Sequence, residues 1–261
     1  VVLPKFLKPL KVKRSNLIRI GPKKDGGYVI DKRILGKSKT LISCGLNDDW
    51  EFEKDFLKKN GDTSIICYDH TVNNEFWYNR FKKDILALLL LKKIKLSKIL
   101  DVFKYLEYKF FFRKNKIHYQ KKIVSRQTND EEITIAKILS RYNKNVILKI
   151  DIEGDEYGVF KDIKKNSNKI LFLILELHGV DKKIKKIQNF LKKLDLKIIH
   201  IHGNNYGGVD KNENPKVIEL SLLNSKKVKI LNIHSNNEYP IINLDYKNLK
   251  RKNDIKIKFF E

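Results

Sequence analysis

The segment from 146 to 160, VILKIDIEGDEYGVF, holds the most specific arrangement of reactive side chains in the sequence. An apolar run that predicts a buried strand ends in two acids, Asp151 and Glu153, and a helix is expected to begin near Asp155. Because side chains alternate along a strand, Asp151 and Glu153 should point to one side, at the sheet edge where open α/β proteins bind ligands. Two such carboxylates could bind a metal, share a proton or orient the hydroxyl groups of a ligand. Capping of the following helix suits Asp155 better than Asp151.

Histidines and a further acid follow the next two apolar runs. Glu176 and His178 end ILELHG, and His200 and His202 lie two residues apart in IIHIHGNNYGG. Alternation sends His200 and His202 to one side of a strand, as the ligands of a metal can lie. Two histidines without further ligands are more often core or surface residues, so no metal site is predicted. The polar groups at the ends of three strands instead indicate the rim of an active site.

A glycine turn follows an earlier apolar run, in TLISCGLNDDWEFEKDF at 40–56. Gly45 lets a ligand approach the backbone, and Asn47 and Asp48 open a helix whose free N–H groups can receive an anion. The segment lacks the three glycines of a dinucleotide fingerprint and the Gly-Lys-Ser/Thr of a phosphate loop. Asp69 ends the next strand, 24 residues after Gly45, where an acid can accept hydrogen bonds from ribose hydroxyls. A helix cap or a surface turn is the alternative role for Asp69.

A sheet must bring these residues together, and the hydrophobic pattern predicts one. Short apolar runs rich in β-branched residues alternate with amphipathic helical patterns, which favours parallel strands joined by crossover helices. Helices are expected at about 130–142, from Asn47 or Asp48 onward, and behind Asp181 as a helix cap. From residue 226 onward the chain could add an edge strand or a hairpin. The expected strands are 40–44, 64–68, 146–150, 170–177, 196–202 and 217–223.

Length, charge and composition bound the class of protein. The 261 residues suit a single domain over 1–261, and 56 basic against 31 acidic residues give a formal net charge of +25, which favours negatively charged partners. A hydrophobic content of 41% excludes global disorder. No apolar run approaches the roughly 20 residues of a membrane span, and the first residues do not resemble a secretory signal. Cys44 and Cys67 lie in predicted strands and are expected to be buried free thiols, which fits a reducing cytoplasm.

The stretch 72–122 breaks the alternation of strands and helices. It is long, rich in lysine and aromatic residues, and mostly helical in pattern. We expect a helical insertion after the second strand, lying as a lid over the ligand-binding edge of the sheet. An ordinary pair of packed helices with solvated lysines carries equal weight.

Five segments follow one another in a recognisable order: DGGYVI at 25–30, SCGLNDDWEFEKDF at 43–56, CYDHT at 67–71, LKIDIEGDEYGVF at 148–160 and LELHG at 175–179. Together they resemble the FkbM-like branch of the class I S-adenosylmethionine-dependent methyltransferases. The resemblance implies a Rossmann-like, mostly parallel sheet of seven strands whose last strand, 217–223, is antiparallel. It also implies an enzyme that transfers a methyl group from S-adenosylmethionine and releases S-adenosylhomocysteine.

The resemblance assigns the cofactor to the residues around the glycine turn. The methionine part would lie against the turn, Asp69 would hold the ribose, and the segment around Tyr28 would close over the cofactor. Asp151 would face the sulfonium and the acceptor. The residues expected to bind the cofactor are Asp25, Gly26, Tyr28, Cys44, Gly45, Asn47, Asp69, Asp151 and Glu153.

Methyl transfer to a hydroxyl also needs a base. The reaction is an in-line displacement, so holding the reactants in line supplies much of the catalysis. A hydroxyl acceptor must lose its proton, and the strand ends carry the candidates. His178 is the preferred base, with Asp151 and Glu153 orienting the cofactor amine or the acceptor hydroxyl. His202 is the competitor.

The acceptor and the partners follow from the resemblance and the charge. FkbM-like enzymes commonly O-methylate secondary metabolites or glycans, so the resemblance implies a small-molecule or glycan-type acceptor, with a role in surface polysaccharide biosynthesis. The basic surface suits an anionic acceptor, or an enzyme held at the anionic inner face of a membrane. Nucleic acid is the runner-up acceptor, although no RNA-binding signature is present. A non-catalytic subunit that binds the cofactor or a sugar is the third interpretation.

Overall fold

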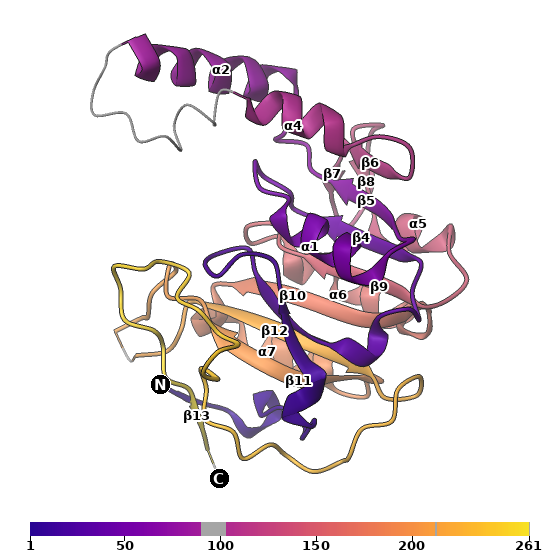
Figure 1. Cartoon of the computed structure of the whole chain (residues 1–261). Helices are drawn as coiled ribbons and strands as arrows, with labels where there is room; N and C mark the ends of the chain where they lie inside the picture. Colours follow the sequence, from indigo (N-terminus) through magenta and orange to yellow (C-terminus); the bar gives the residue numbers. More distant parts are fainter. Residues whose placement is uncertain (90–102, 212, 261) are drawn as a thin grey trace.

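A seven-stranded sheet forms the centre of the protein. The computed structural model describes residues 1–89, 103–211 and 213–260. The strands are β4 Thr40–Cys44, β5 Ser64–Tyr68, β6 Lys116–Tyr119, β9 Val146–Ile150, β10 Ile170–His178, β11 Leu196–Gly203 and β12 Val217–Asn224. Their order across the sheet is β11, β12, β10, β9, β4, β5, β6 (Figure 1). β12 runs antiparallel to both neighbours and every other neighbouring pair is parallel, which confirms the predicted sheet.

Six of these strands lie where the hydrophobic runs predict them. β4, β5 and β9 have the predicted bounds, and β10, β11 and β12 each extend one residue further. Every residue of β9 and of β12 is buried, because both faces of these strands are covered. The pattern does not predict the seventh strand, β6, because its four residues, KIHY, are only partly buried at the edge of the sheet.

Helices cover the two faces of the sheet (Figure 1). α5 Ile135–Ser140, α6 Glu156–Lys165 and α7 Val180–Leu191 pack in a row on one face, and α1 Glu51–Asn60 lies on the other. This division follows from right-handed crossovers, because the chain moves from β4 to β5 through α1 but in the opposite direction along the sheet from β9 to β10 through α6. The direction therefore reverses between β4 and β9, where open α/β sheets bind ligands.

The starts of three helices differ from the prediction. α1 does not begin at Asn47 or Asp48, because Asn47 has a φ of 50° and lies in a turn ahead of the helix. α5 begins later than expected and is capped by the hydroxyl of Thr134. Gly179, with a φ of 65°, precedes α7, so Asp181 lies in the first turn and not at the cap.

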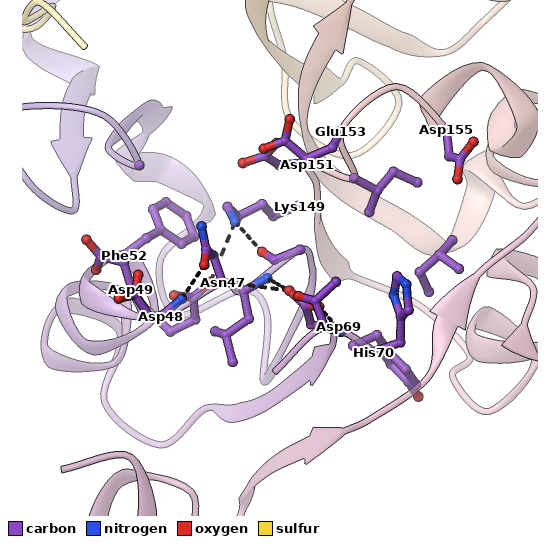
Figure 2. A pocket seen from close by; sticks show the side chains of 18 of the residues that line it. Asn47, Asp48, Asp49, Phe52, Asp69, His70, Lys149, Asp151, Glu153 and Asp155 are labelled. Carbon is purple, nitrogen blue, oxygen red and sulfur yellow. Dashed lines mark hydrogen bonds and ion pairs between the residues drawn. The ribbon is translucent and has the colours of Figure 1, made fainter. Parts of the chain in front are cut away.

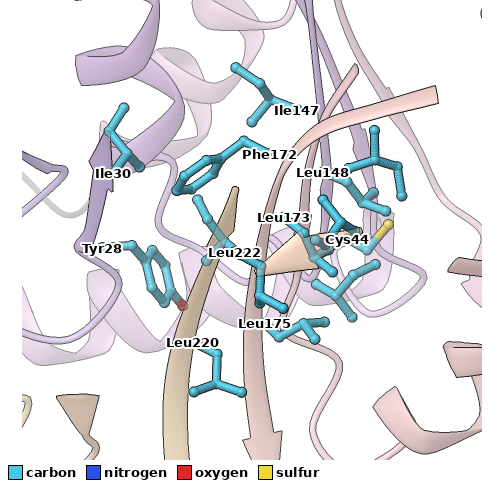
Figure 3. Close-up of a cluster of buried hydrophobic side chains, with 14 of the residues drawn as sticks. Tyr28, Ile30, Cys44, Ile147, Leu148, Phe172, Leu173, Leu175, Leu220 and Leu222 are labelled. Carbon is cyan, nitrogen blue, oxygen red and sulfur yellow. The ribbon is translucent and has the colours of Figure 1, made fainter. Parts of the chain in front are cut away.

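Three two-stranded sheets surround the central one: β1 Val2–Leu3 with β13 Lys258–Phe259, β2 Leu17–Ile20 with β3 Tyr28–Asp31, and β7 Lys122–Ile123 with β8 Glu132–Ile133. The C-terminal tail thus adds a strand to the small sheet with β1, not to the edge of the central sheet. Figure 3 shows Tyr28 and Ile30 of β3 beside the buried side chains of β10 and β12. The β2–β3 hairpin therefore covers the α1 face of the sheet next to the reversal point.

The segment expected to be an insertion connects β5 to β6. It contains α2 Asn74–Leu89 and α4 Lys104–Phe111, as the helical pattern predicts, and residues 90–102 lie outside the described part of the chain. Its last residues form β6, which pairs in parallel with β5. The helices are therefore part of an enlarged crossover that returns the chain to the sheet.

An aromatic cluster anchors this crossover to α1. The ring centroid of Trp50, ahead of α1, lies 6.3 Å from that of Trp77 on α2 and 5.8 Å from that of Tyr108 on α4. Trp77 and Tyr108 lie 4.9 Å apart, and all three side chains are buried. Edge-to-face and tilted aromatic pairs at these distances add attraction to the burial of apolar area.

The two cysteines are free and buried, as predicted. Burial raises the pKa of the Cys44 thiol to about 12, so it stays protonated at neutral pH. Over the residues that the structure describes, none of the helices combines the length and the apolar character that crossing a bilayer requires.

Replacement of Trp50 by alanine tests the aromatic anchor. Because the side chain is 1% exposed, W50A should lower the free energy of unfolding by about 3–5 kcal/mol in urea denaturation. Phe81, an exposed aromatic residue of α2, is the matched control, and F81A should change the value by less than about 0.5 kcal/mol. Equal effects of the two substitutions would contradict the anchor.

Candidate active site

The site is built on a close approach of two backbone segments at the reversal point. Gly45 follows β4 with a φ of 87°, and a Cβ placed on it would lie 1.6 Å from the carbonyl oxygen of Asp151, which follows β9. The amide of Asp151 donates to the carbonyl of Cys44 at 2.9 Å, and the amide of Gly45 donates to that of Tyr68 at 3.0 Å. A glycine is therefore required at position 45 because the end of β9 packs against its backbone, and this requirement comes before any approach of a ligand.

A cavity of about 460 Å³ opens beside this contact (Figure 2). It is lined from the ends of β4, β5 and β9, with the loop before β3 and the start of β7 closing its sides. Seven of the nine residues expected to bind the cofactor line it: Asp25, Gly26, Gly45, Asn47, Asp69, Asp151 and Glu153. Of the predicted lid, only Lys121 and Lys122 reach the cavity among the described residues, so α2 and α4 do not cover it as a lid would.

The lining is acidic although the chain is strongly basic. Among the described residues, eight carboxylates face four lysines around the cavity. Such a lining favours a ligand that carries positive charge close to the reversal point. The acids are Asp25, Asp48, Asp49, Glu53, Asp69, Asp151, Glu153 and Asp155, and the lysines are Lys24, Lys121, Lys122 and Lys149.

Asp69 holds the glycine turn in place. One carboxylate oxygen accepts from the amides of Leu46 and Asn47 at 2.8 and 2.9 Å, and the other accepts from the amide and hydroxyl of Thr71 at 2.8 and 2.6 Å. Burial opposes ionisation, but these hydrogen bonds outweigh it and lower the pKa of Asp69. The amides expected to receive an external anion thus bind the carboxylate of Asp69, and a ribose hydroxyl at Asp69 would have to share these acceptors.

Lys149 is a buried cation within the cavity wall. Its Nζ donates to the carbonyl of Gly45 at 2.9 Å and lies 4.0 Å from a carboxylate oxygen of Glu53, which itself accepts from the Ser43 hydroxyl at 2.6 Å. Burial disfavours its charge, but the charges of Glu53 and Asp151 outweigh burial and raise the pKa of Lys149. Lys149 is not among the residues predicted from the sequence, although a lysine inside the apolar run VILKI is the signal that could have revealed it.

The hydroxyl of Tyr28 lies between Asp151 and a second buried acid, Glu176. The Tyr28 hydroxyl lies 3.1 Å from Asp151 Oδ2 and 2.8 Å from Glu176 Oε2. A phenol has one hydrogen, so the two carboxyl groups compete for the hydrogen bond that Tyr28 donates, and the shorter contact is to Glu176. Burial raises the pKa of Asp151 to about 6 and raises that of Glu176 well above its ordinary value. Tyr28 therefore lies behind Asp151 and does not line the cavity, and Cys44 is likewise buried below the turn.

Glu156, which is not among the residues predicted from the sequence, holds the ring of His178 in place. Its Nδ1 lies 2.9 Å from Glu156 Oε1, and that oxygen also accepts from the amides of Gly154 and Ile152 at 2.9 and 3.3 Å. Because ionised Glu156 can only accept, Nδ1 carries the hydrogen and Nε2 is directed toward Glu153, 3.5 Å away. Burial lowers the pKa of His178, but its hydrogen bond to Glu156 and the nearby charges outweigh burial and raise it.

The structure brings together the side chains of Asp151, Glu153 and His178, but the alternation of side chains along a strand is not the reason. One ligand atom of each lies within 4.8 Å of the others, an arrangement that could bind a cation or a ligand hydroxyl. β9 ends before Asp151, and Glu153 has a φ of 54°, so a turn brings the acids together. His178 is not part of the cavity wall but adjoins the two acids that are.

His202 lies outside the cavity, in a buried ion pair. Its two nitrogens lie 3.2 Å from Glu219 and 3.2 Å from Asp254, and these acids outweigh the effect of burial and raise its pKa to about 10. It is therefore protonated at neutral pH and cannot accept a proton as the competing base would. His200 pairs instead with Asp245 at 2.8 Å, so the two histidines do not share a ligand.

Residues 31–198, more than half of the chain, match the Methyltransferase FkbM domain. The chain belongs to the FkbM methyltransferase family. This confirms the resemblance carried by the five segments, and the protein is an S-adenosylmethionine-dependent methyltransferase. No curated protein matches this FkbM methyltransferase.

Solved structures similar to this FkbM methyltransferase are distant from it. The fibrillarin pre-rRNA processing protein of Methanococcus jannaschii is 8% identical, with 73% of this chain and 67% of the other covered and a TM-score of 0.36. A predicted O-methyltransferase of Agrobacterium tumefaciens is 10% identical over 73% and 77%, with a TM-score of 0.33. The tRNA (uracil-54, C5)-methyltransferase of Pyrococcus abyssi, in complex with S-adenosyl-L-homocysteine, is 13% identical over 80% and 44%, with a TM-score of 0.36. The family assignment rests on the domain match.

Replacement of Glu156 by glutamine tests how His178 is held. The pairing with Glu156 raises the pKa of His178 above its unfolded value of about 6.5. The pairing therefore stabilises the folded protein fully below about pH 6.5, and this stabilisation disappears as the pH rises through the folded-state pKa of His178. E156Q should lower the pKa of His178 in an NMR titration of the imidazole. Asp155, whose side chain does not cap α6, is the control, and D155N should leave this titration unchanged. An unaltered pKa in E156Q would refute the pairing.

Proposed function

We propose that this methyltransferase binds S-adenosylmethionine in the acidic cavity and methylates a hydroxyl group of a sugar or glycan-type acceptor. The observation that carries the proposal is an acid-lined cavity at the reversal point of an otherwise strongly basic chain. S-adenosylmethionine supplies an electrophilic methyl group on a sulfonium, and it also carries an ammonium and a carboxylate. Carboxylates around the cavity suit the two cationic groups, and Asp69 lies at the strand end that suits a ribose.

The predicted cofactor residues divide into those that would touch the cofactor and those that support them. Asp25, Asp151 and Glu153 would face the ammonium and the sulfonium, and Gly26 and Asn47 would contribute backbone and amide contacts at the rim. Tyr28 and Cys44 support the wall from behind. Tyr28 does so through its hydrogen bond to Asp151, which keeps the Asp151 carboxylate at the cavity surface.

Lys149 suits the cofactor carboxylate. Of the four lysines around the cavity it alone is buried, and a buried ammonium requires an anionic or strongly polar partner for each of its hydrogens. Among the residues that the structure describes, the carbonyl of Gly45 is its one hydrogen-bond acceptor, since Glu53 is 4.0 Å away. A ligand carboxylate beside the glycine turn would therefore complete the coordination of Lys149.

His178 would act as the base. Glu156 fixes the ring so that Nε2 is directed to the side of Asp151 and Glu153. A hydroxyl placed there can transfer its proton to Nε2 as the methyl group arrives, and the imidazolium is stabilised by Glu156. Asp151 and Glu153 would orient the acceptor hydroxyl.

The charge distribution supports an anionic acceptor. The described cavity lining is acidic, so the excess positive charge of the chain lies elsewhere, where it would attract a phosphorylated, nucleotide-linked or acidic sugar. Such an acceptor fits surface polysaccharide biosynthesis in the cytoplasm. Methylation of RNA in place of sugars would overturn this part of the proposal.

Calorimetry with S-adenosylhomocysteine tests cofactor binding. The wild-type protein should bind it, and K149M should bind it about 10- to 100-fold more weakly, the loss expected for one charged hydrogen bond. S-adenosyl-3-thiopropylamine, which lacks only the carboxylate, should bind both proteins equally. K121M, at the cavity rim, is the control. If the wild type did not bind S-adenosylhomocysteine, cofactor binding in this cavity would be refuted. If K149M lost equal affinity for both ligands, the proposed contact between Lys149 and the cofactor carboxylate would be refuted.

Transfer of labelled methyl groups to a panel of neutral and acidic sugars tests the base. H178A should lower kcat by about 10²- to 10⁴-fold while S-adenosylhomocysteine still binds. The wild-type rate should rise with pH through the raised pKa of His178, and in E156Q this rise should move to lower pH. If H178A and D151A both retained full turnover, the proposed roles of these residues would be abandoned.

A further inference from the structure

Helix α2 carries an apolar stripe that faces solvent. Tyr78, Phe81, Leu86 and Leu89 follow the spacing i, i+3, i+8 and i+11 of one helix face, and they are between 47% and 73% exposed. The helix is held to the protein by a different residue, Trp77, which is buried in the aromatic cluster. The solvent-facing stripe therefore has no role in packing the described fold.

Helix α4 repeats this arrangement. Phe103, Leu106 and Phe110 have the spacing i, i+3 and i+7 and are each at least half exposed. On its other side Tyr108 packs against Trp50 and Trp77. Both helices are thus apolar on two faces, one packed and one open, and Figure 1 shows them extending beyond the sheet at the β5–β6 end.

Basic side chains lie along the open stripes. Nζ of Lys82 lies 4.1 Å from the ring centroid of Tyr78, and the guanidinium carbon of Arg113 lies 4.4 Å from that of Phe110. Long basic side chains placed in this way cover apolar surface with their stems while the charge reaches outward. Around α4 the basic residues exceed the acidic ones, with Lys104, Lys109, Arg113, Lys114 and Lys116 against Glu107, which is itself paired with Lys54.

The positive charge beside the open faces of α2 and α4 indicates which kind of partner they bind. A second copy of the chain would bring another 25 positive charges toward the same basic helices and would be repelled. An anionic bilayer surface accepts both features, because aromatic and aliphatic side chains enter the headgroup boundary while lysine and arginine bind the lipid phosphates. We propose that the open faces of α2 and α4 bind the protein to an anionic lipid surface.

This surface is separate from the catalytic site. No residue of α2 or α4 is among those that line the cavity in the described part of the chain, so lipid binding leaves the cavity open. The two helices hold the enzyme at the bilayer through the β5–β6 end of the sheet, with the cofactor cavity at the ends of β4, β5 and β9.

Vesicle co-sedimentation with the full chain tests this proposal. The wild type should bind vesicles of equal parts phosphatidylglycerol and phosphatidylcholine, bind less as salt rises, and not bind phosphatidylcholine alone. The triple variant F81S/L86S/L89S should bind about a hundredfold more weakly. A matched control replaces three equally exposed apolar residues of the C-terminal tail, as L231S/I233S/I242S, and should bind as the wild type does.

Three results would overturn the proposal. They are no binding to the anionic vesicles, equal binding to both vesicle compositions, and equal binding by the α2 variant and the wild type. Sedimentation equilibrium on the same samples decides whether the stripe binds a second copy instead, which would appear as a concentration-dependent dimer lost in the α2 variant. Circular dichroism melting of both triple variants should match the wild type, and none of these measurements depends on cofactor binding.

Discussion

The contact between the backbones of Gly45 and Asp151 is the constraint on which the site depends. β4 and β9 are adjacent in the sheet, and their ends continue toward each other until no Cβ fits at Gly45. This approach sets the turn that Asp69 holds, and it brings the carbonyl of Gly45 within reach of Lys149. The cavity exists because the chain diverges from this one point in both directions along the sheet.

A second constraint is the balance of buried charge behind the cavity. Glu176 and Glu219 stand directly opposite each other across β10 and β12, and both are buried. Two ionised carboxylates in that position would repel strongly. The structure relieves this repulsion by pairing Glu219 with protonated His202, while burial raises the pKa of Glu176, which favours its neutral form, and Glu176 Oε2 accepts from the Tyr28 hydroxyl. Asp151 can therefore remain ionised at the cavity surface at neutral pH.

The composition gives a net charge of +25, and the structure shows that this charge is unevenly distributed. Among the described residues, acids outnumber lysines around the cavity, whereas the chain as a whole is strongly basic. The positive charge of the chain therefore lies mostly away from the cavity, whose described lining is acidic. The proposed cofactor cavity and the proposed lipid-binding faces of α2 and α4 therefore lie in different parts of the molecule.

The sequence by itself determines the sheet and the position of the cavity on it. Six strands, the glycine turn and the acids at the strand ends follow from hydrophobic periodicity and local residue types, which depend on near neighbours in the chain. It does not determine the partners of the side chains. Glu156 holds His178 from 22 residues away, and Asp254 pairs with His202 from 52 residues away. Only the packing of helix on sheet and of the C-terminal tail on β11 decides such contacts, because burial and charge pairing act between residues that the fold, not the chain, makes neighbours.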